Sequence, residues 1–136
     1  MNFELLREQL TRHEGYATKP YEDSVGKLTI GIGHNLADVG LSDDAIQLIF
    51  HEDIERAVAD CQKMFPNWHD IPDVKQVILC NMMFNMGYTV LSRFKQFRDA
   101  ISKKEWIRAS QEMEDSRWFR QVKGRGVELR DLMRGY

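Results

Sequence analysis

The sequence contains little cysteine and has no long apolar run. Only two of its 136 residues are cysteines, too few for a disulfide framework. Cys61 and Cys80 lie beside apolar residues in helical patterns, so we interpret both as reduced core thiols, and we expect no metal site. The apolar runs are shorter than the roughly 18 residues that cross a membrane, and residues 1–12 are too polar for a signal peptide. We therefore expect synthesis in the cytoplasm and no stable membrane association.

The chain also carries little net charge, −2 for the whole sequence. This near-neutral total argues against DNA or RNA as the main partner. The charge is unevenly distributed: residues 1–60 hold five basic and twelve acidic residues, about −7, and residues 61–136 hold fourteen and nine, about +5. Two such parts could orient an anionic polymer between them, although many of these charges could equally solvate exposed helix faces.

Two segments near the N-terminus have contrasting patterns. Apolar residues recur at helical spacing over residues 3–14, and a glycine follows, so we predict a helix that ends at Glu14. Residues 17–36 change to short extended pieces separated by proline and glycine. This pattern predicts a small antiparallel sheet with tight turns, with Asp23 in a turn and Thr29 on a strand.

A long helix is predicted to follow the sheet. Ser42 is a good N-cap, and the apolar residues after it form one helical stripe, so this helix should join two lobes, with a soft division near residue 60. The next helix should begin after Asp70 and end at Gly87. Its sequence leaves little polar face, which indicates a helix in the core.

The remaining sequence is also helical in pattern. A short helix is expected around residues 91–97, and Ser102 and Glu105 have the spacing of a capping box for the helix after them. The whole chain, residues 1–136, is long enough for one domain with a substantial core. We predict the α+β class, with a small N-terminal lobe that carries the sheet and a mostly helical C-terminal lobe.

Three polar side chains surround the predicted sheet, and they suggest one kind of chemistry. Cleavage of a glycosidic bond requires a neutral acid that protonates the leaving oxygen and an ionised carboxylate across the sugar ring. Glu14 and Asp23 could divide these tasks, since Leu10 and Tyr16 flank Glu14 and could partly bury it as a protonated acid. Asp23 could equally cap its own turn, and Thr29 alone has ordinary strand propensity.

Two glycines, Gly31 and Gly33, follow Thr29 at a spacing that superficially suggests a phosphate loop. The lysine and serine that complete such a loop do not follow them, so nucleotide binding is disfavoured. Close backbone packing explains these glycines better.

The residues around this trio resemble the active-site signature of phage-type lysozymes, glycoside hydrolase family 24. The matching residues are Glu14-Gly15, Tyr21-Glu22-Asp23, Gly26 and Thr29-Ile30-Gly31-Ile32-Gly33-His34. Later stretches also resemble the family, namely Asn81–Gly87 and Ser116–Phe119 followed by Arg125. Two departures are Asn85, where the family pattern has Gln, and the end of the chain at Tyr136, earlier than in longer members.

The resemblance implies a lysozyme-like fold and an endolysin-type muramidase that needs no cofactor. The expected substrate is the peptidoglycan glycan strand, cut at the β-1,4 bond between N-acetylmuramic acid and N-acetylglucosamine. Glu14 would donate the proton, Asp23 would stabilise charge or act as a base, and Thr29 would assist a water molecule. A monomer made in the host bacterial cytoplasm would reach the wall only after the membrane is permeabilised.

The same resemblance suggests that Asn85, Trp118 and Arg125 help to bind substrate, and that Arg125 pairs with Glu14. The plainer interpretations are that Trp118 is a core aromatic and that Arg125 is a solvated basic residue. Two other functions remain open: a non-catalytic module for wall binding or phage assembly, and a lytic transglycosylase. Reducing-end products, anhydro products or no products would separate the three.

One charged residue of the long helix generates a prediction. Asp53 lies at helical spacing within an apolar stripe, so it needs a partner, and His34 ends the neighbouring strand-forming run. We predict a structural ion pair between His34 and Asp53. Substituting each residue singly and then both by alanine should reveal a coupling free energy of unfolding of about 0.5–3 kcal/mol. Additive effects would show instead that Asp53 faces solvent.

Overall fold

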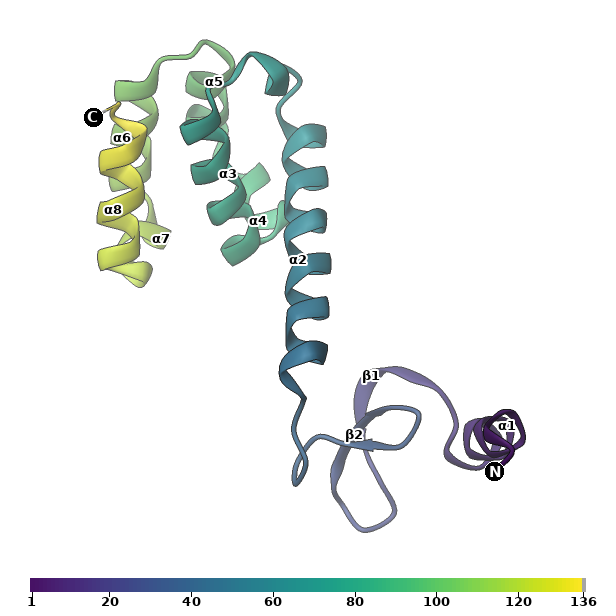
Figure 1. The fold of residues 1–136 in the computed structure, drawn as a ribbon. Helices are drawn as coiled ribbons and strands as arrows, with labels where there is room; N and C mark the ends of the chain where they lie inside the picture. The colour runs from purple at the N-terminus through teal and green to yellow at the C-terminus, as the bar shows by residue number, and fades with distance from the viewer. Residues whose placement is uncertain (136) are drawn as a thin grey trace. The chain divides into compact units, whose positions relative to one another are not determined.

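The computed structural model describes residues 1–135, and Tyr136 lies outside the described residues. The chain forms two compact units, one from Met1 to Leu48 and one beginning at Ile49 (Figure 1). The two units thus divide between Leu48 and Ile49, inside the helix Asp43–Met64, and not near residue 60 where we predicted the lobe division. Within residues 1–135, no helix is both long and apolar enough to cross a membrane.

The first unit begins with helix α1 (Phe3–Glu14). The Asn2 side chain caps its start by accepting a hydrogen bond from the Leu5 amide at 3.0 Å. Gly15 ends it with a positive φ of 79°, and its amide donates to the Thr11 carbonyl. The predicted helix that delivers Glu14 at its last turn is therefore confirmed.

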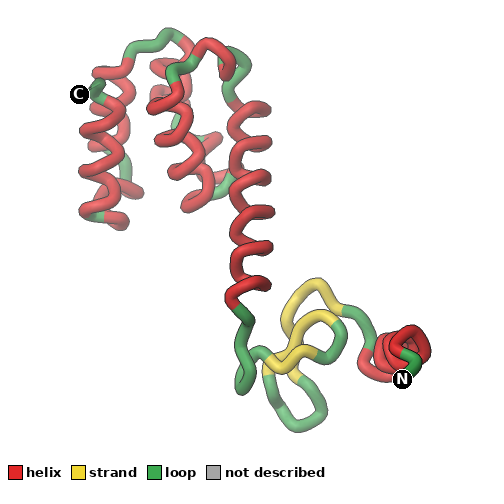
Figure 2. Tube along the Cα trace, viewed as in Figure 1, coloured by secondary structure: helices red, strands yellow, loops and turns green. Residues whose placement is uncertain are grey.

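A three-stranded antiparallel sheet follows, with strand order β1-β2-β3 (Figure 2). The strands are β1 (Ala17–Glu22), β2 (Leu28–Gly31) and β3 (His34–Asn35). The register of β1 against β2 is irregular between Ala17 and Tyr21, and this stretch contains Pro20, which has no amide hydrogen for the ladder. The predicted small sheet is confirmed, with Thr29 on its central strand.

Helix α2 (Asp43–Met64) starts in the first unit and continues into the second. Its N-cap is Ser42, whose hydroxyl accepts a hydrogen bond from the Ala45 amide at 3.1 Å. Asp43 and Asp44 in the first turn complement the positive end of the helix dipole. The predicted long helix and its cap are both confirmed.

The second unit is helical and holds the main core. Its elements after α2 are η1 (Trp68–Asp70), α3 (Asp73–Met86), α4 (Tyr88–Ser92), α5 (Lys95–Ser102), α6 (Trp106–Glu114), α7 (Arg117–Val122) and α8 (Gly124–Met133). Helix α8 packs against α3, α6 and α7. Cys61 is fully buried and Cys80 partly buried, and both are free, which confirms them as thiols of the core. The chain thus combines a small antiparallel sheet in the first unit with a helical second unit, which confirms the predicted α+β class.

The predicted capping box at residues 102–105 is wrong. Ser102 is the last residue of α5, and its hydroxyl donates to the Asp99 carbonyl at 2.7 Å. The chain then reverses at Lys104, which has a φ of 55°, and α6 begins at Trp106 without a side-chain cap. Glu105 pairs with Arg108 instead, at 3.0 Å. Ser102 therefore belongs to the end of α5, and Glu105 belongs to the turn between α5 and α6, so the two residues do not form a capping box.

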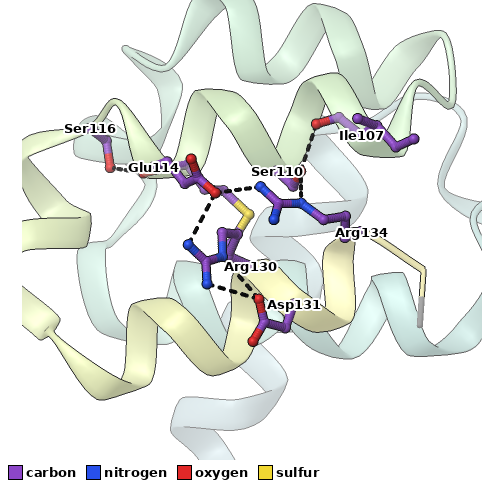
Figure 3. Close-up of polar contacts among 8 residues, drawn as sticks. Ile107, Ser110, Glu114, Ser116, Arg130, Asp131 and Arg134 are labelled. Carbon is purple, nitrogen blue, oxygen red and sulfur yellow. Dashed lines mark hydrogen bonds and ion pairs between the residues drawn. The ribbon is translucent and has the colours of Figure 1, made fainter.

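Polar groups link α6 to α8 (Figure 3). Glu114 accepts from Arg130 at 3.0 Å and also from Arg134. Arg134 donates in addition to the fully buried Ser110 hydroxyl at 3.1 Å, and this hydroxyl donates to the Ile107 carbonyl at 2.6 Å. The buried serine is therefore satisfied in both roles, which a buried hydroxyl requires.

Lys75 of α3 is a buried cation that holds the end of α8. Only 6% of the residue is exposed, and its ammonium donates to the carbonyls of Leu132 at 2.6 Å and Met133 at 2.8 Å. The last carbonyls of a helix have no partner within the helix, so Lys75 supplies what α8 lacks. Burial lowers the pKa of Lys75 below its ordinary value.

This contact predicts that Lys75→Met lowers the free energy of unfolding by about 1–3 kcal/mol. The Met133 carbonyl would lose its donor, and the Leu132 carbonyl would keep only the Gly135 amide. The difference between native protein and variant should grow as the pH rises from the lowered folded pKa of Lys75 toward its ordinary value of 10.5. In that window the folded state binds fewer protons than the unfolded state, so the native protein gains stability with pH.

Denaturant titrations at several pH values measure both effects. Lys95→Met, at an exposed position of α5, is the matched control and should change little. Equal stability of the two variants would contradict the capping role of Lys75.

Candidate active site

Glu14, at the end of α1, lies against Gly33 in the turn between β2 and β3. A Cβ atom built on Gly33 would lie 2.6 Å from Oε2 of Glu14 and 2.9 Å from its Cδ. Such distances are shorter than any van der Waals contact, so the Glu14 side chain occupies space that only glycine leaves open. The packing interpretation is therefore confirmed for Gly33.

Gly31 is needed for a different reason. Its φ is 69°, close to the 68° of Gly33, but a Cβ atom there would meet nothing within 4 Å. The backbone conformation, not a neighbour, favours glycine at this position. A substitution of Gly31 should therefore introduce backbone strain alone, whereas a substitution of Gly33 should introduce both strain and a clash with Glu14.

The burial expected for Glu14 is not supplied by the first unit. Glu14 is exposed, Tyr16 is 76% exposed and Leu10 is 43% exposed. The chain leaves the helix at Gly15, so Tyr16 is not part of the last turn of α1. Helical spacing alone therefore did not predict the surroundings of this carboxyl group.

Asp23 builds the turn that follows β1. Its Oδ1 atom accepts hydrogen bonds from the amides of Val25 at 2.9 Å and Lys27 at 2.8 Å. Backbone hydrogen bonds from Asp23 to the Lys27 carbonyl and from Gly26 to the Asp23 carbonyl close the turn. Among residues 1–135, the other carboxylate oxygen, Oδ2, has no hydrogen-bond partner. Asp23 therefore caps its turn with one carboxylate oxygen, and the other oxygen takes no part in the turn.

Thr29 lies on the central strand, opposite Tyr21 on one side and Asn35 on the other. It is 3% exposed, and its hydroxyl donates to the Lys27 carbonyl at 2.9 Å. Because the hydroxyl hydrogen is engaged there, the oxygen can only accept a hydrogen bond from another group. A water molecule bound to Thr29 would therefore act as the donor.

The Lys27 backbone connects two members of the trio, and sequence reasoning missed this residue. Its amide holds Asp23 and its carbonyl holds Thr29. The sequence did carry a sign of it, because an aspartate that caps a turn accepts hydrogen bonds from amides a few residues later, and Lys27 lies four residues after Asp23. All three polar side chains thus belong to Met1–Leu48. The sheet and its turn hold Asp23 and Thr29 by hydrogen bonds, and Glu14 lies against the turn at Gly33.

The predicted substrate-binding residues lie in the second unit and divide into two pairs. Arg125 donates to the Asn81 side-chain oxygen, from Nε at 2.9 Å and from Nη2 at 2.6 Å. Trp118 donates from its indole nitrogen to the Asn85 side chain at 2.8 Å, and it is buried, with 5% exposed. The plainer interpretation of Trp118 as a core aromatic therefore fits its position.

Asn81 was not singled out from the sequence. It lies one helical turn before Asn85 on α3, so the two amides share a face of the helix. This spacing was the available signal. Through these amides, α3 fixes both an arginine and a tryptophan of the C-terminal segment.

Two other residues predicted to pair with each other have local contacts instead. His34 meets the Gly40 carbonyl through Nε2, and Asp53 pairs with Arg56 at 3.1 Å within α2. The pair between His34 and Asp53 stays a prediction, as does the pair between Glu14 and Arg125.

The sequence matches the phage lysozyme family over residues 11–134. It is 30% identical to the pre-baseplate central spike protein Gp5 of Enterobacteria phage T4 over 91% of the chain, which is 26% of that protein's length. It is also similar to the probable T4-type lysozymes 2 and 1 of Dictyostelium discoideum, at 24% and 23% identity. These matches cover 86% and 88% of the chain and the same shares of the two relatives. The chain therefore spans about a quarter of the spike protein and most of each of the other two.

The contact between Glu14 and Gly33 predicts different effects for two similar substitutions. Gly33→Ala and Gly31→Ala should each cost about 1–2 kcal/mol of stability, since alanine disfavours a positive φ. Only Gly33→Ala should also displace the Glu14 carboxyl group, because of the added contact. The ¹³C chemical shift of that carboxyl, measured by NMR, should change in Gly33→Ala and stay near the native value in Gly31→Ala. An equal change of the Glu14 carboxyl chemical shift in both variants would contradict the contact between Glu14 and Gly33.

Proposed function

Because this chain belongs to the phage lysozyme family, we propose that it is a muramidase that hydrolyses peptidoglycan. The bond cut would be the β-1,4 linkage between N-acetylmuramic acid and N-acetylglucosamine. The observation that carries this proposal is the arrangement of the first unit, which holds Glu14 over the Gly33 turn and ties Asp23 and Thr29 to one backbone residue. Such hydrolysis requires two carboxyl groups, and a hydroxyl whose oxygen accepts a hydrogen bond from water can position the water that attacks.

Each residue has a separate task in the proposed reaction. Glu14 gives its proton to the glycosidic oxygen as the bond between that oxygen and the sugar carbon breaks. The free oxygen of Asp23 stabilises the positive charge that develops on the sugar carbon, and it can then take a proton from the attacking water. Thr29 orients this water by accepting its hydrogen bond. The products are a sugar with a new reducing end and a Glu14 carboxylate that solvent protonates again.

The second unit would hold the glycan strand. Arg125 is fixed by Asn81 and partly buried, so its orientation costs little further entropy when it binds an anionic group. Asn85 is exposed while its side-chain oxygen is engaged by Trp118, which leaves its amide hydrogens for a ligand. Trp118 would then act by positioning Asn85, not by stacking on a sugar.

A second candidate is a module of a phage particle. The similarity to the T4 central spike protein, of which this chain spans about a quarter, favours it. In one version the module keeps its enzyme activity, and in another it only binds the wall. A third candidate, lytic transglycosylase activity, uses the same acid but lets a hydroxyl of the sugar attack in place of water. Mass spectrometry of digested peptidoglycan separates them by reducing ends, anhydro ends or no cleavage.

The proposed roles predict a graded series of variants. Glu14→Gln should lower turnover by at least about 10²–10⁴, because the amide cannot donate the proton. Asp23→Asn keeps an oxygen for the turn but loses the negative charge, so it should also cripple a hydrolase. Thr29→Ser should be milder than Thr29→Val, since serine retains the oxygen that accepts from water.

Release of soluble muropeptides measures turnover, and sedimentation with insoluble peptidoglycan measures binding. Glu8→Gln, at an exposed position of α1, is the matched control and should keep native turnover. Full activity of folded Glu14→Gln protein would refute the assignment of the acid. Anhydro products with an active Asp23→Asn variant would favour the transglycosylase.

A further inference from the structure

Lys27 has a partner for its side chain as well as for its backbone. Its ammonium group donates to Oδ1 of Asp38, in the turn that follows β3, at 3.2 Å. The other carboxylate oxygen of Asp38 accepts from the Asn35 side-chain amide at 3.2 Å, and the Asn35 side-chain oxygen accepts from the Asp38 backbone amide at 3.0 Å. Lys27, Asn35 and Asp38 thus form one hydrogen-bonded set, which we call the Lys27 network.

The Lys27 network lies on the face of the sheet that carries Thr29. Asn35 on β3 is the cross-strand partner of Thr29 on β2, and the side chains of such partners project to the same face. Lys27 precedes Thr29 by two residues, which is the spacing of side chains on one face of an extended chain. Lys27 and Asn35 are therefore neighbours of the buried Thr29 side chain, one along the chain and one across the sheet.

The turn that carries Asp23 is held mainly by hydrogen bonds within itself. These bonds run between Asp23 and residues 25–27. Residues 24–28 are exposed, and Gly26, with a φ of 82°, is the residue type that restricts the backbone least. The hydrogen bond from the Lys27 side chain to Asp38 joins this turn to the segment after β3. It therefore limits movement of the Lys27 backbone, which holds both Asp23 and Thr29.

We propose that Lys27 is a positioning residue for the hydrolysis, and that Asp38 and Asn35 hold it in place. This inference rests on the proposed function, because it concerns where the charge of Asp23 and the water bound to Thr29 lie during the reaction. The Lys27 network acts through the Lys27 backbone, whose amide fixes one oxygen of Asp23 at 2.8 Å and whose carbonyl fixes the Thr29 hydroxyl at 2.9 Å. A displacement of this backbone would therefore move both groups together.

The Lys27 network contributes more to placement than to stability. The Lys27 and Asp38 side chains are 47% and 54% exposed, and exposed ion pairs stabilise a fold only slightly. The placement of reacting groups is far more sensitive, since a displacement on the order of 1 Å can lower a rate by about 10². Loss of the network should therefore reduce turnover strongly and the unfolding temperature only slightly.

Steady-state kinetics on soluble peptidoglycan fragments test this role. Lys27→Met removes the ammonium group and should lower kcat by roughly tenfold. KM should stay near the native value, because Asp23 and Thr29 act after the glycan is bound, and the unfolding midpoint should move by no more than a few degrees. Asp38→Asn should also lower kcat, and the double variant should lose no more activity than either single variant, because the two side chains act as a unit. Lys27→Arg, which keeps the cation, should restore most of the native turnover.

A spectroscopic measurement tests the same inference without catalysis. The ¹³C chemical shift of the Asp23 carboxyl group and the methyl shift of Thr29, measured by NMR, should both change in Lys27→Met and in Asp38→Asn. Both should stay near the native values in Lys19→Met, at an exposed position of β1, which is the matched control. The control should also keep native turnover.

The outcomes separate this inference from the proposed function. A native chain that releases no muropeptides would refute the proposed function, and the NMR shifts would still decide whether the Lys27 network places Asp23 and Thr29. Unchanged NMR shifts in Lys27→Met would overturn the positioning role, whatever the turnover, and would leave an ordinary surface ion pair. A loss of activity that appears only as a higher KM or a lower unfolding midpoint, or that Lys27→Arg does not restore, would overturn it as well.

Discussion

The first unit depends on one close approach, that of the Glu14 side chain to the backbone at Gly33. The approach brings the side chain of the last residue of α1 against the turn between β2 and β3. The absence of a side chain at Gly33 is what makes it possible. Asp23 and Thr29 are attached to the same sheet through the Lys27 backbone. A change at the glycine would therefore move the acid while leaving the other two groups in place.

The second unit uses polar side chains in its interior, and most of these contacts converge on α3. Lys75 holds the end of α8, Asn81 holds Arg125, and Asn85 holds Trp118. Each contact joins α3 to a residue far along the chain, and each satisfies a buried or partly buried group. Hydrophobic burial supplies most of the driving force for folding, but these bonds determine which arrangement of short helices is formed.

The features that the sequence predicted well were local. The helix that ends at Glu14, the Asp23 turn, the Thr29 strand and the Ser42 cap each depend on a few neighbouring residues and on backbone preferences. The family resemblance, carried by spaced motifs, gave the assignment of the trio that local patterns left open.

The features that were missed depend on distant partners or on competition between neighbours. Lys75 looked like an ordinary helical lysine, because the carbonyls it caps lie more than fifty residues away. Ser102 had the spacing of a capping box, but the preceding helix extends to include it. The predicted burial of Glu14 was wrong, because the residues next to it in sequence do not cover its side chain in the first unit. Local patterns contain no information on such contacts.

Helix α2 has a consequence for how this chain can change in evolution. It passes from one compact unit to the other without a glycine or proline between Asp43 and Met64. Each residue of a helix adds about 100° of rotation and about 1.5 Å of rise. A single residue inserted or deleted between Ala57 and Cys61 would therefore turn one part of the buried face of α2 away from the other part by more than a quarter of a circle, whereas a substitution would not. The spacing of the residues that α2 buries in the second unit is thus a stricter constraint on this segment than its composition.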